Sequence, residues 1–328
     1  MKYFFTKYRF FLSGAALILT AASCTSTLSD EPATDARAIS FTPAAETRAA
    51  VEADFPGGSS FSVWGWYGTT GSSTIDKTVF DNIPVTKSGE AWTYTGGTQY
   101  WIPGMTYNFY GVYPAYSQTS DNNGTTATVT PDGTITVTNF DCSATGENAV
   151  DLMTATHTRD YNGTNADAVN MPFQHELAKV EVSVRTDQGV TATIENAKLT
   201  GMVYKGTLTA TSNSSTWAPI TSTSDETPYQ VTEPVTINTP STTSLFGDIL
   251  IIPQKTDKLT LNIAITRDEE ENTYNFDLGT SIAQWTAGRS YRYVLTIEAD
   301  AITFSDFTVD EWGETHTGGD INIGTSDN

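Results

Sequence analysis

Cysteine, histidine and basic residues are scarce in this chain of 328 residues. With only two cysteines, Cys24 and Cys142, the sequence offers no disulfide framework, and a chain of this length can rely on a buried core instead. The 17 Lys and Arg residues face 38 Asp and Glu residues, for a net charge of −21. Nucleic-acid phosphates repel such a surface, so the composition argues against nucleic-acid binding.

Long hydrophobic runs are also missing. The longest apolar run, residues 10–22, has about 13 residues, whereas a membrane-spanning helix needs about 20. Lys2, Lys7 and Arg9 precede the run, and small residues lead into Cys24. This order is typical of a bacterial export signal that ends at a lipidation site. We therefore expect residues 1–23 to be a signal peptide and Cys24 to carry lipid; the alternative is an ordinary secretory signal with an incidental cysteine.

Removal of residues 1–23, which hold three basic and no acidic residues, would leave 14 basic and 38 acidic residues. Such acidity favours solubility outside the cell. Cys142 would then have no partner for a disulfide. The remaining length suggests two domains.

What the sequence does contain is many short β-branched and aromatic runs separated by turn residues. Several of these runs alternate between apolar and polar residues, which predicts strands with one buried face. Strong helix formers are thin, and no amphipathic helix is evident. The pattern predicts an all-β fold of sandwich type. The runs are residues 61–67, 107–113, 134–138, 179–185, 259–265 and 291–297.

The domain organisation follows from changes in composition along the chain. Residues 25–36 are polar and predict a tether from the lipid to the fold. A polar, turn-rich stretch covers 156–170, and a new strand pattern begins at 171. We therefore predict a lipidated tether with a removable first strand at 24–48, one sandwich at 49–170, and a second sandwich at 171–328 that includes the C-terminal tail.

No recognisable set of catalytic residues is present. His157, His175 and His316 are far apart in the sequence. His175 and Glu176 begin like a zinc-protease motif, but Lys179 stands where the second histidine would be. The nucleophile elbow and the phosphate-binding loop are missing too. We expect no catalytic residues, no metal and no cofactor, and we expect His175 to be structural.

An acidic cluster, residues 268–272, lies between two predicted strands. Its oxygen ligands would suit calcium, but the ligand spacing of a calcium loop is absent. A solvated hairpin tip is the favoured interpretation.

Aromatic side chains suggest a second kind of site. Trp64, Trp66 and Tyr67, together with Tyr100 and Trp101, would suit a platform for stacking sugars. Trp64 and Trp66 share one face of a predicted strand, and burial in the core is the commoner fate of such a face.

Several stretches together resemble the fimbrillins of Bacteroidales, the subunits of type V pili, including the Mfa-like branch. The resemblance covers nearly the whole chain and depends on the order of the stretches. They are residues 61–67, 92–94, 99–103, 107–114, 151–155, 173–180, 285–293, 302–304 and 309–312.

This resemblance implies two β-sandwich domains of transthyretin-like topology and a structural or adhesive role in a surface fimbria. In this family a lipidated precursor reaches the outer membrane, and a trypsin-like or arginine-specific protease then cuts near the N-terminus. The cut releases the lipid and the first strand. A strand of a neighbouring subunit fills the groove that opens, and the processed subunit belongs to an extracellular fimbrium.

The residues of this chain fit that sequence of events. Ile39 and Phe41 alternate with polar residues and predict a removable first strand. Arg48, followed by Ala49, is the first choice for the cut. Arg37 is the second choice, although a cut there would leave Ile39 and Phe41 in place. The alternative is that Arg48 is only a linker residue.

The donor strand is less clear from the sequence. In the tail after Trp312, only Ile321 and Ile323 alternate, and the stronger segment 302–309 would also suit the last strand of its own domain. A tip or anchor subunit, or a permanently anchored lipoprotein that binds glycans, therefore remain alternatives. The expected partners are other fimbrial subunits, the outer membrane through the lipid on Cys24, and a host or bacterial surface ligand.

Overall fold

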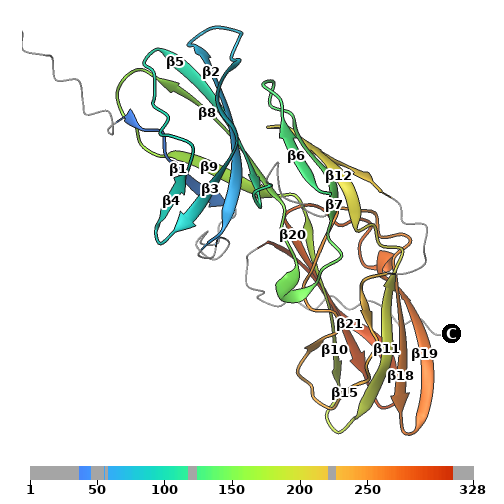
Figure 1. The fold of residues 1–328 in the computed structure, drawn as a ribbon. Coiled ribbons are helices and arrows are strands. Elements are labelled where there is room, and N and C mark those ends of the chain that lie inside the picture. The colour runs from blue at the N-terminus through green and yellow to red at the C-terminus, as the bar shows by residue number, and fades with distance from the viewer. Residues whose placement is uncertain (1–36, 46–54, 56–57, 117–123, 221–226, 313–328) are drawn as a thin grey trace, which may run out of the picture.

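The computed structural model describes residues 37–45, 55, 58–116, 124–220 and 227–312 (Figure 1). In this part of the chain β-strands predominate, no α-helix is present, and two short 3-10 helices are η3 (Gly146–Asn148) and η4 (Leu278–Thr280). The all-β prediction is confirmed. Across the same residues, no helix has the length and apolar character to cross a membrane.

The largest sheet has seven strands and brings together the first and the later strands of the N-terminal half. We call residues 37–116 and 153–175 the N-terminal body. In spatial order its strands are β1 (Phe41–Ala45), β9 (Val169–His175), β8 (Met153–Tyr161), β5 (Met105–Tyr113), β2 (Ser60–Thr69), β3 (Lys77–Ser88) and β4 (Ala91–Tyr94).

Three further sheets make up the rest of the described chain. The four-stranded sheet consists of β6 (Thr126–Val129), β7 (Ile135–Asp141), β12 (Lys205–Ala210) and β13 (Ser215–Pro219). One five-stranded sheet consists of β10 (Ala178–Thr186), β16 (Thr243–Ser244), β17 (Ile249–Ile251), β20 (Arg289–Ile297) and β21 (Ile302–Glu311). The other consists of β11 (Ala192–Thr200), β14 (Gln230–Val231), β15 (Val235–Ile237), β18 (Thr260–Arg267) and β19 (Glu270–Asp277).

Figure 1 shows the N-terminal body at the upper left and β10, β11, β18, β19 and β21 at the lower right. The alternation of β2 explains how the body is packed on both faces. Phe61 and Val63 point into a core inside the body, whereas Trp64 and Trp66 point the other way, into a core shared with Ile135 and other residues of the C-terminal sheets. The two faces of this strand thus serve two different cores.

The predicted domain boundary near residue 170 does not match the strand pairing. β8 and β9 run through most of the stretch that the sequence marks as a linker, and both belong to the seven-stranded sheet. Polar residues can occupy this stretch because β8 pairs with β5 through main-chain groups, which needs no apolar side chains. In the second half of β8, every other side chain is exposed to solvent. The division of the chain stays a proposal, and the pairing favours a division between His175 and Ala178.

A short sequence pattern occurs once in each half of the chain. Residues 101–107 and 285–291 both carry Trp at the first, Gly at the fourth and Tyr at the seventh position. In both copies the amide after the tryptophan donates to the tyrosine hydroxyl at 2.9 Å. Both tryptophans are buried.

The segment that pairs with this pattern is also equivalent in the two halves. Trp101 N donates to Arg37 O, and Trp285 N donates to Gln254 O, each at 2.9 Å. Antiparallel bridges follow at Ala38 with Tyr100 and at Lys255 with residue 284. This correspondence supports the proposal of two related domains, although their transthyretin-like topology stays a prediction.

Candidate functional site

The first strand, β1, is an edge strand of the seven-stranded sheet. Within the described residues it pairs along one side only, in parallel with β9. Just before β1, Ile39 N donates to Gln99 O at 2.8 Å, and Arg37 O accepts from Trp101 N at 2.9 Å. Residues 37–39 are therefore held along one edge by residues 99–101, whereas β1 itself is held along the opposite edge by β9.

Side chains of this segment alternate between the core and solvent. Ile39, Phe41 and Pro43 are buried, whereas Ser40 and Thr42 are exposed. The Phe41 side chain is only 3% exposed. Four aromatic rings surround it with centroid distances of 5.2–6.3 Å, those of Phe61, Phe80, Tyr94 and Phe109. The segment thus supplies a central part of the core of the N-terminal body.

The main-chain groups alternate in the same way. Ser40 O accepts from Val169 N at 2.7 Å on the β9 side, whereas Ile39 O accepts from the Tyr94 hydroxyl at 3.0 Å on the β4 side. By this alternation Phe41 and Pro43 turn their main-chain groups toward β4. Burial raises the pKa of Tyr94 above its ordinary value, mainly because desolvation disfavours the phenolate.

A half-open cleft of about 390 Å³ separates β1 from β4, the other edge strand of the sheet. Phe41, Pro43, Phe55 and Trp92 lie along it. In Figure 1, β1 and β4 lie on the same side of the N-terminal body. Because proline has no N–H, Pro43 cannot donate a main-chain hydrogen bond across this cleft.

Phe55 closes one end of the same region. Its side chain is 2% exposed, and its ring meets those of Trp92, Tyr113 and Phe173 edge-on at 5.1–5.7 Å. Lys87 Nζ donates to Phe55 O at 2.8 Å. Phe55 comes seven positions after Arg48, so a cut after Arg48 would leave it on the body.

Several residues singled out from the sequence lie outside the described part of the chain, namely Cys24, Arg48, Ala49, His316, Ile321 and Ile323. Arg37, Ile39 and Phe41 lie within it: Arg37 and Ile39 bond to residues 99–101, and Phe41 pairs with β9. Sequence reasoning missed Pro43 and Phe55. Pro43 continues the alternation of Ile39 and Phe41, so that pattern could have included it, whereas no alternation marks Phe55.

The aromatic residues proposed as a sugar platform are mostly in the core. Trp64, Trp66 and Trp101 are buried, and Tyr67 stacks on Tyr107 with its centroid 5.3 Å away. Only Tyr100 of this set is well exposed, at 40%. The expectation that Trp64 and Trp66 are core residues is confirmed.

His175 lies in a buried polar cluster at the end of β9. His175 Nδ1 lies 2.6 Å from Asp151 Oδ2, and its ring stacks on Trp312 at 4.3 Å. Next to it, Glu176 accepts a 2.5 Å hydrogen bond from the Thr154 hydroxyl, and burial raises the pKa of the Glu176 carboxyl. These contacts join β9 to the end of β21, which gives His175 a packing role.

The second histidine in the described chain, His157, lies on β8. Burial, with a smaller contribution from the Arg159 charge, lowers the pKa of this imidazole. Among the residues that the structure describes, no three metal-ligating side chains gather at one place. Asp268 and Glu269, both with positive φ, form the turn between β18 and β19, so the acidic cluster is at a hairpin tip as predicted.

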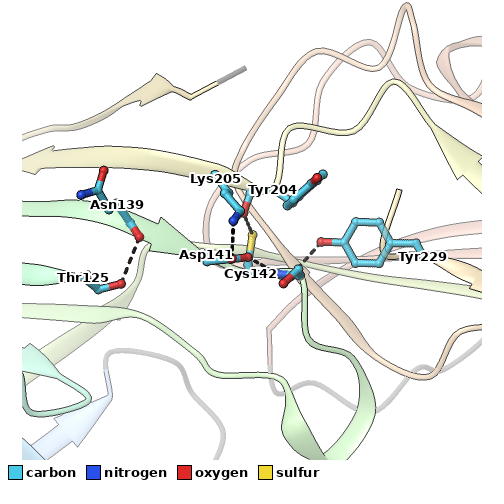
Figure 2. A network of polar contacts seen from close by, with 8 residues as sticks. Thr125, Asn139, Asp141, Cys142, Tyr204, Lys205 and Tyr229 are labelled. Atoms are coloured by element: carbon cyan, nitrogen blue, oxygen red, sulfur yellow. Dashed lines mark hydrogen bonds and ion pairs between the residues drawn. The ribbon is translucent and has the colours of Figure 1, made fainter. Parts of the chain in front are cut away.

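Cys142 lies in a network of polar contacts after β7 (Figure 2). Its Sγ donates to Tyr204 O at 3.1 Å, and the Tyr229 hydroxyl donates to Cys142 O at 2.8 Å. Asp141 and Lys205 form an ion pair of 2.8 Å beside it. Burial raises the pKa of the Cys142 thiol to about 12. The network joins the four-stranded sheet to the segment before β14, and the cysteine is part of the core.

The segment 302–309 is not free to act as a donor in this structure. It belongs to β21, which pairs with β20 from Arg289 to Ile297. Trp312 follows β21, donates its N–H to Gly288 O at 3.0 Å and stacks on His175. Trp312 therefore lies beside the end of β9.

Comparisons with known proteins agree with this geometry. A fimbrial protein from Bacteroides vulgatus superimposes with a TM-score of 0.57 at 17% identity, covering 84% of this chain and 99% of the other. A candidate cell adhesion protein from Bacteroides ovatus gives a TM-score of 0.55 at 15% identity, covering 84% and 96%. These likenesses establish the fold alone. A comparison with curated proteins gave no match.

A family model provides the identification. The model described as fimbrillin-like matches residues 47–312, which is most of the chain and includes β2 to β21. The family resemblance seen in the sequence is thereby confirmed, and this chain belongs to the fimbrillin-like family.

Proposed function

We propose that this protein is a non-enzymatic, structural and adhesive subunit of a cell-surface fimbria. It is exported as a lipoprotein precursor held on the outer membrane through Cys24. A cut after Arg48 then releases the lipid together with β1, and a strand of another subunit takes the place of β1.

The observation that carries the proposal is the position of β1. The segment with Ile39, Phe41 and Pro43 fills the core of the N-terminal body, yet it is attached to the body through a single stretch of chain that contains Arg48. Its loss would expose the rings around Phe41 and the unpaired edge of β9. Such an edge takes up an extended segment readily, because main-chain hydrogen bonds supply the pairing and alternate side chains fill the pockets.

Arg37 fits the cut less well than Arg48. Its carbonyl oxygen accepts a hydrogen bond from Trp101, so the bond after Arg37 is part of a paired segment. A cut there would also leave Ile39 and Phe41 in the core. A cut after Arg48 would release both residues together.

Each subunit in this scheme gives one strand and receives one. Such a contact joins two different surfaces and does not close on itself, so it builds an open filament. The tail after Trp312 is the favoured donor, because β21 is already paired with β20. Its Ile321 and Ile323 provide the two apolar side chains on one face of a strand.

The rival role as an anchored glycan-binding lipoprotein has less support. It depends on exposed aromatic side chains, and Trp64, Trp66 and Trp101 are buried. A tip or anchor subunit would share the same body and differ in its tail.

The test is the Arg48→Ala variant, with Arg37→Ala as its matched control. We expect Arg48→Ala to stay a lipid-bound monomer on the cell, while Arg37→Ala forms filaments like the wild type. N-terminal sequencing of wild-type filaments should give a start at Ala49. Normal filaments from Arg48→Ala would rule out the cut, and a blocked, lipidated Cys24 in filaments would favour an anchor subunit.

A further inference from the structure

We propose that the cleft between β1 and β4 is where a strand of a second copy of this chain first docks, before β1 has left. In this scheme the incoming strand displaces β1 from its Ala45 end toward Ile39. The inference rests on the proposed function and adds to it the route of the exchange.

The walls of the cleft suit an extended segment. On one side is the edge of β1 that faces away from β9, and on the other is the outer edge of β4, which pairs only with β3 in the described part of the chain. Both walls are strand edges, and such edges pair with an added strand. The cleft of about 390 Å³ has room for side chains, and its lining combines the half-buried Trp92 and the exposed Ala91 with the polar Ser40, Thr42, Lys87 and Glu90, above the buried Phe41 and Phe55.

Pro43 helps to keep this cleft open. Its main chain faces β4 by the alternation of the strand, and its nitrogen has no hydrogen to donate. A residue with an N–H at this position would allow β4 to pair with β1 and close the sheet. Proline on a strand edge has this blocking effect in general.

The two ends of the segment are held unequally. At the start, three hydrogen bonds lie outside the β9 ladder: from Ile39 N to Gln99 O, from Trp101 N to Arg37 O, and from the Tyr94 hydroxyl to Ile39 O. At the Ala45 end, only the parallel ladder with β9 is present among the described residues. The cut after Arg48 would free this same weakly held end, three residues beyond Ala45.

The occupant is the tail of a second copy. The tail after Trp312 has 16 residues, more than the five that β1 contributes to its ladder. It contains the alternating pair Ile321 and Ile323, and a strand with that pattern can place both side chains on one face, toward Trp92 and Pro43 of the cleft. Docking beside β1 lets the new strand form bonds before the old strand loses all of its own.

The test follows release of a fluorescent label on the tether of the full chain after the protease cut. If docking precedes departure, the rate of release should rise with subunit concentration. The Ala91→Trp variant places an indole in the cleft and should slow both release and filament growth by about tenfold or more. Thr93→Trp is the matched control, because Thr93 is an exposed residue of the same strand that does not line the cleft; it should behave as wild type.

The proposed docking site would be ruled out if the label were released at a rate independent of subunit concentration. It would also be ruled out if Ala91→Trp and Thr93→Trp released the label at equal rates. If wild-type subunits fail to assemble after the cut, the proposed function itself fails, which is a different outcome. Thermal unfolding of the uncut variants checks that the fold is intact. If Ala91→Trp unfolds, Ala91→Arg replaces it with the same expectation.

Discussion

Replacing Phe41 by alanine in the uncut chain should lower the free energy of unfolding of the N-terminal body by about 4 kcal/mol. Truncation of a buried phenylalanine to alanine costs about 3–5 kcal/mol. Phe41 is 3% exposed and touches four aromatic rings edge-on or nearly so. Pairs of this kind add about 0.5–1.5 kcal/mol each beyond burial, so the loss should not lie at the bottom of the range.

The assay is urea unfolding followed by tryptophan fluorescence. With a slope of about 2 kcal/mol per molar urea, the midpoint of the transition should fall by about 2 M. The matched control is Thr42→Ala, the exposed neighbour in the same strand, which should change stability by about 0.5 kcal/mol or less.

A second measurement uses the chain after the protease cut. The fragment that carries β1 is then held without a covalent bond, and about 4 kcal/mol corresponds to nearly three powers of ten in its affinity for the body. Phe41→Ala should therefore lose the fragment far more readily than Thr42→Ala. Equal midpoints and equal retention for the two variants would refute the reasoning, because Phe41 would then contribute nothing to the core.

Two predictions concern buried groups elsewhere. The first uses a chain that carries Cys24→Ser, so that Cys142 is its single thiol. At about pH 8, iodoacetamide should leave Cys142 unmodified in the folded state and modify it in urea, because burial raises the pKa of this thiol to about 12. Rapid modification without urea would contradict its burial. Burial likewise raises the pKa of the Glu176 carboxyl above 4.5, so the folded state binds the carboxyl proton more tightly than the unfolded chain does. The contribution of this group to stability therefore falls as the pH rises from 4.5 to the raised pKa. Urea midpoints should therefore show Glu176→Gln gaining stability relative to wild type across that window; a constant difference would mean that Glu176 ionises normally.

Much of the fold could be predicted because most strands carry their own pattern. The alternation around Trp64 and Val182 marks strands whose side chains the structure buries. The family resemblance could be recognised for a related reason. Its most distinctive residues, such as Trp101 and Trp285, are core residues, and the amide that follows each of them donates to a tyrosine hydroxyl.

The features that the sequence does not reveal arise where pairing is not local. The polar part of β8 has the composition of a linker, and only its pairing with β5 makes it a strand. Pro43 and Phe55 belong to the cleft because the ends of a seven-stranded sheet come close together, and no neighbouring residue records that approach. The pattern shared by residues 101–107 and 285–291 rests on few identical positions, so its equivalence becomes clear only from the bonds.

That shared pattern bears on the polarity of a filament. In the second half, the pairing segment Gln254–Thr256 lies between β17 and β18, so its chain continues into sheet strands at both ends. No single cut can detach it. In the first half, the equivalent segment Arg37–Ile39 precedes every strand of the body, and a cut after Arg48 would detach it whole. Under the proposed function, only the first half would therefore lose its pairing segment. A subunit would then accept one incoming strand, and filaments of such subunits would grow without branches and have two unlike ends.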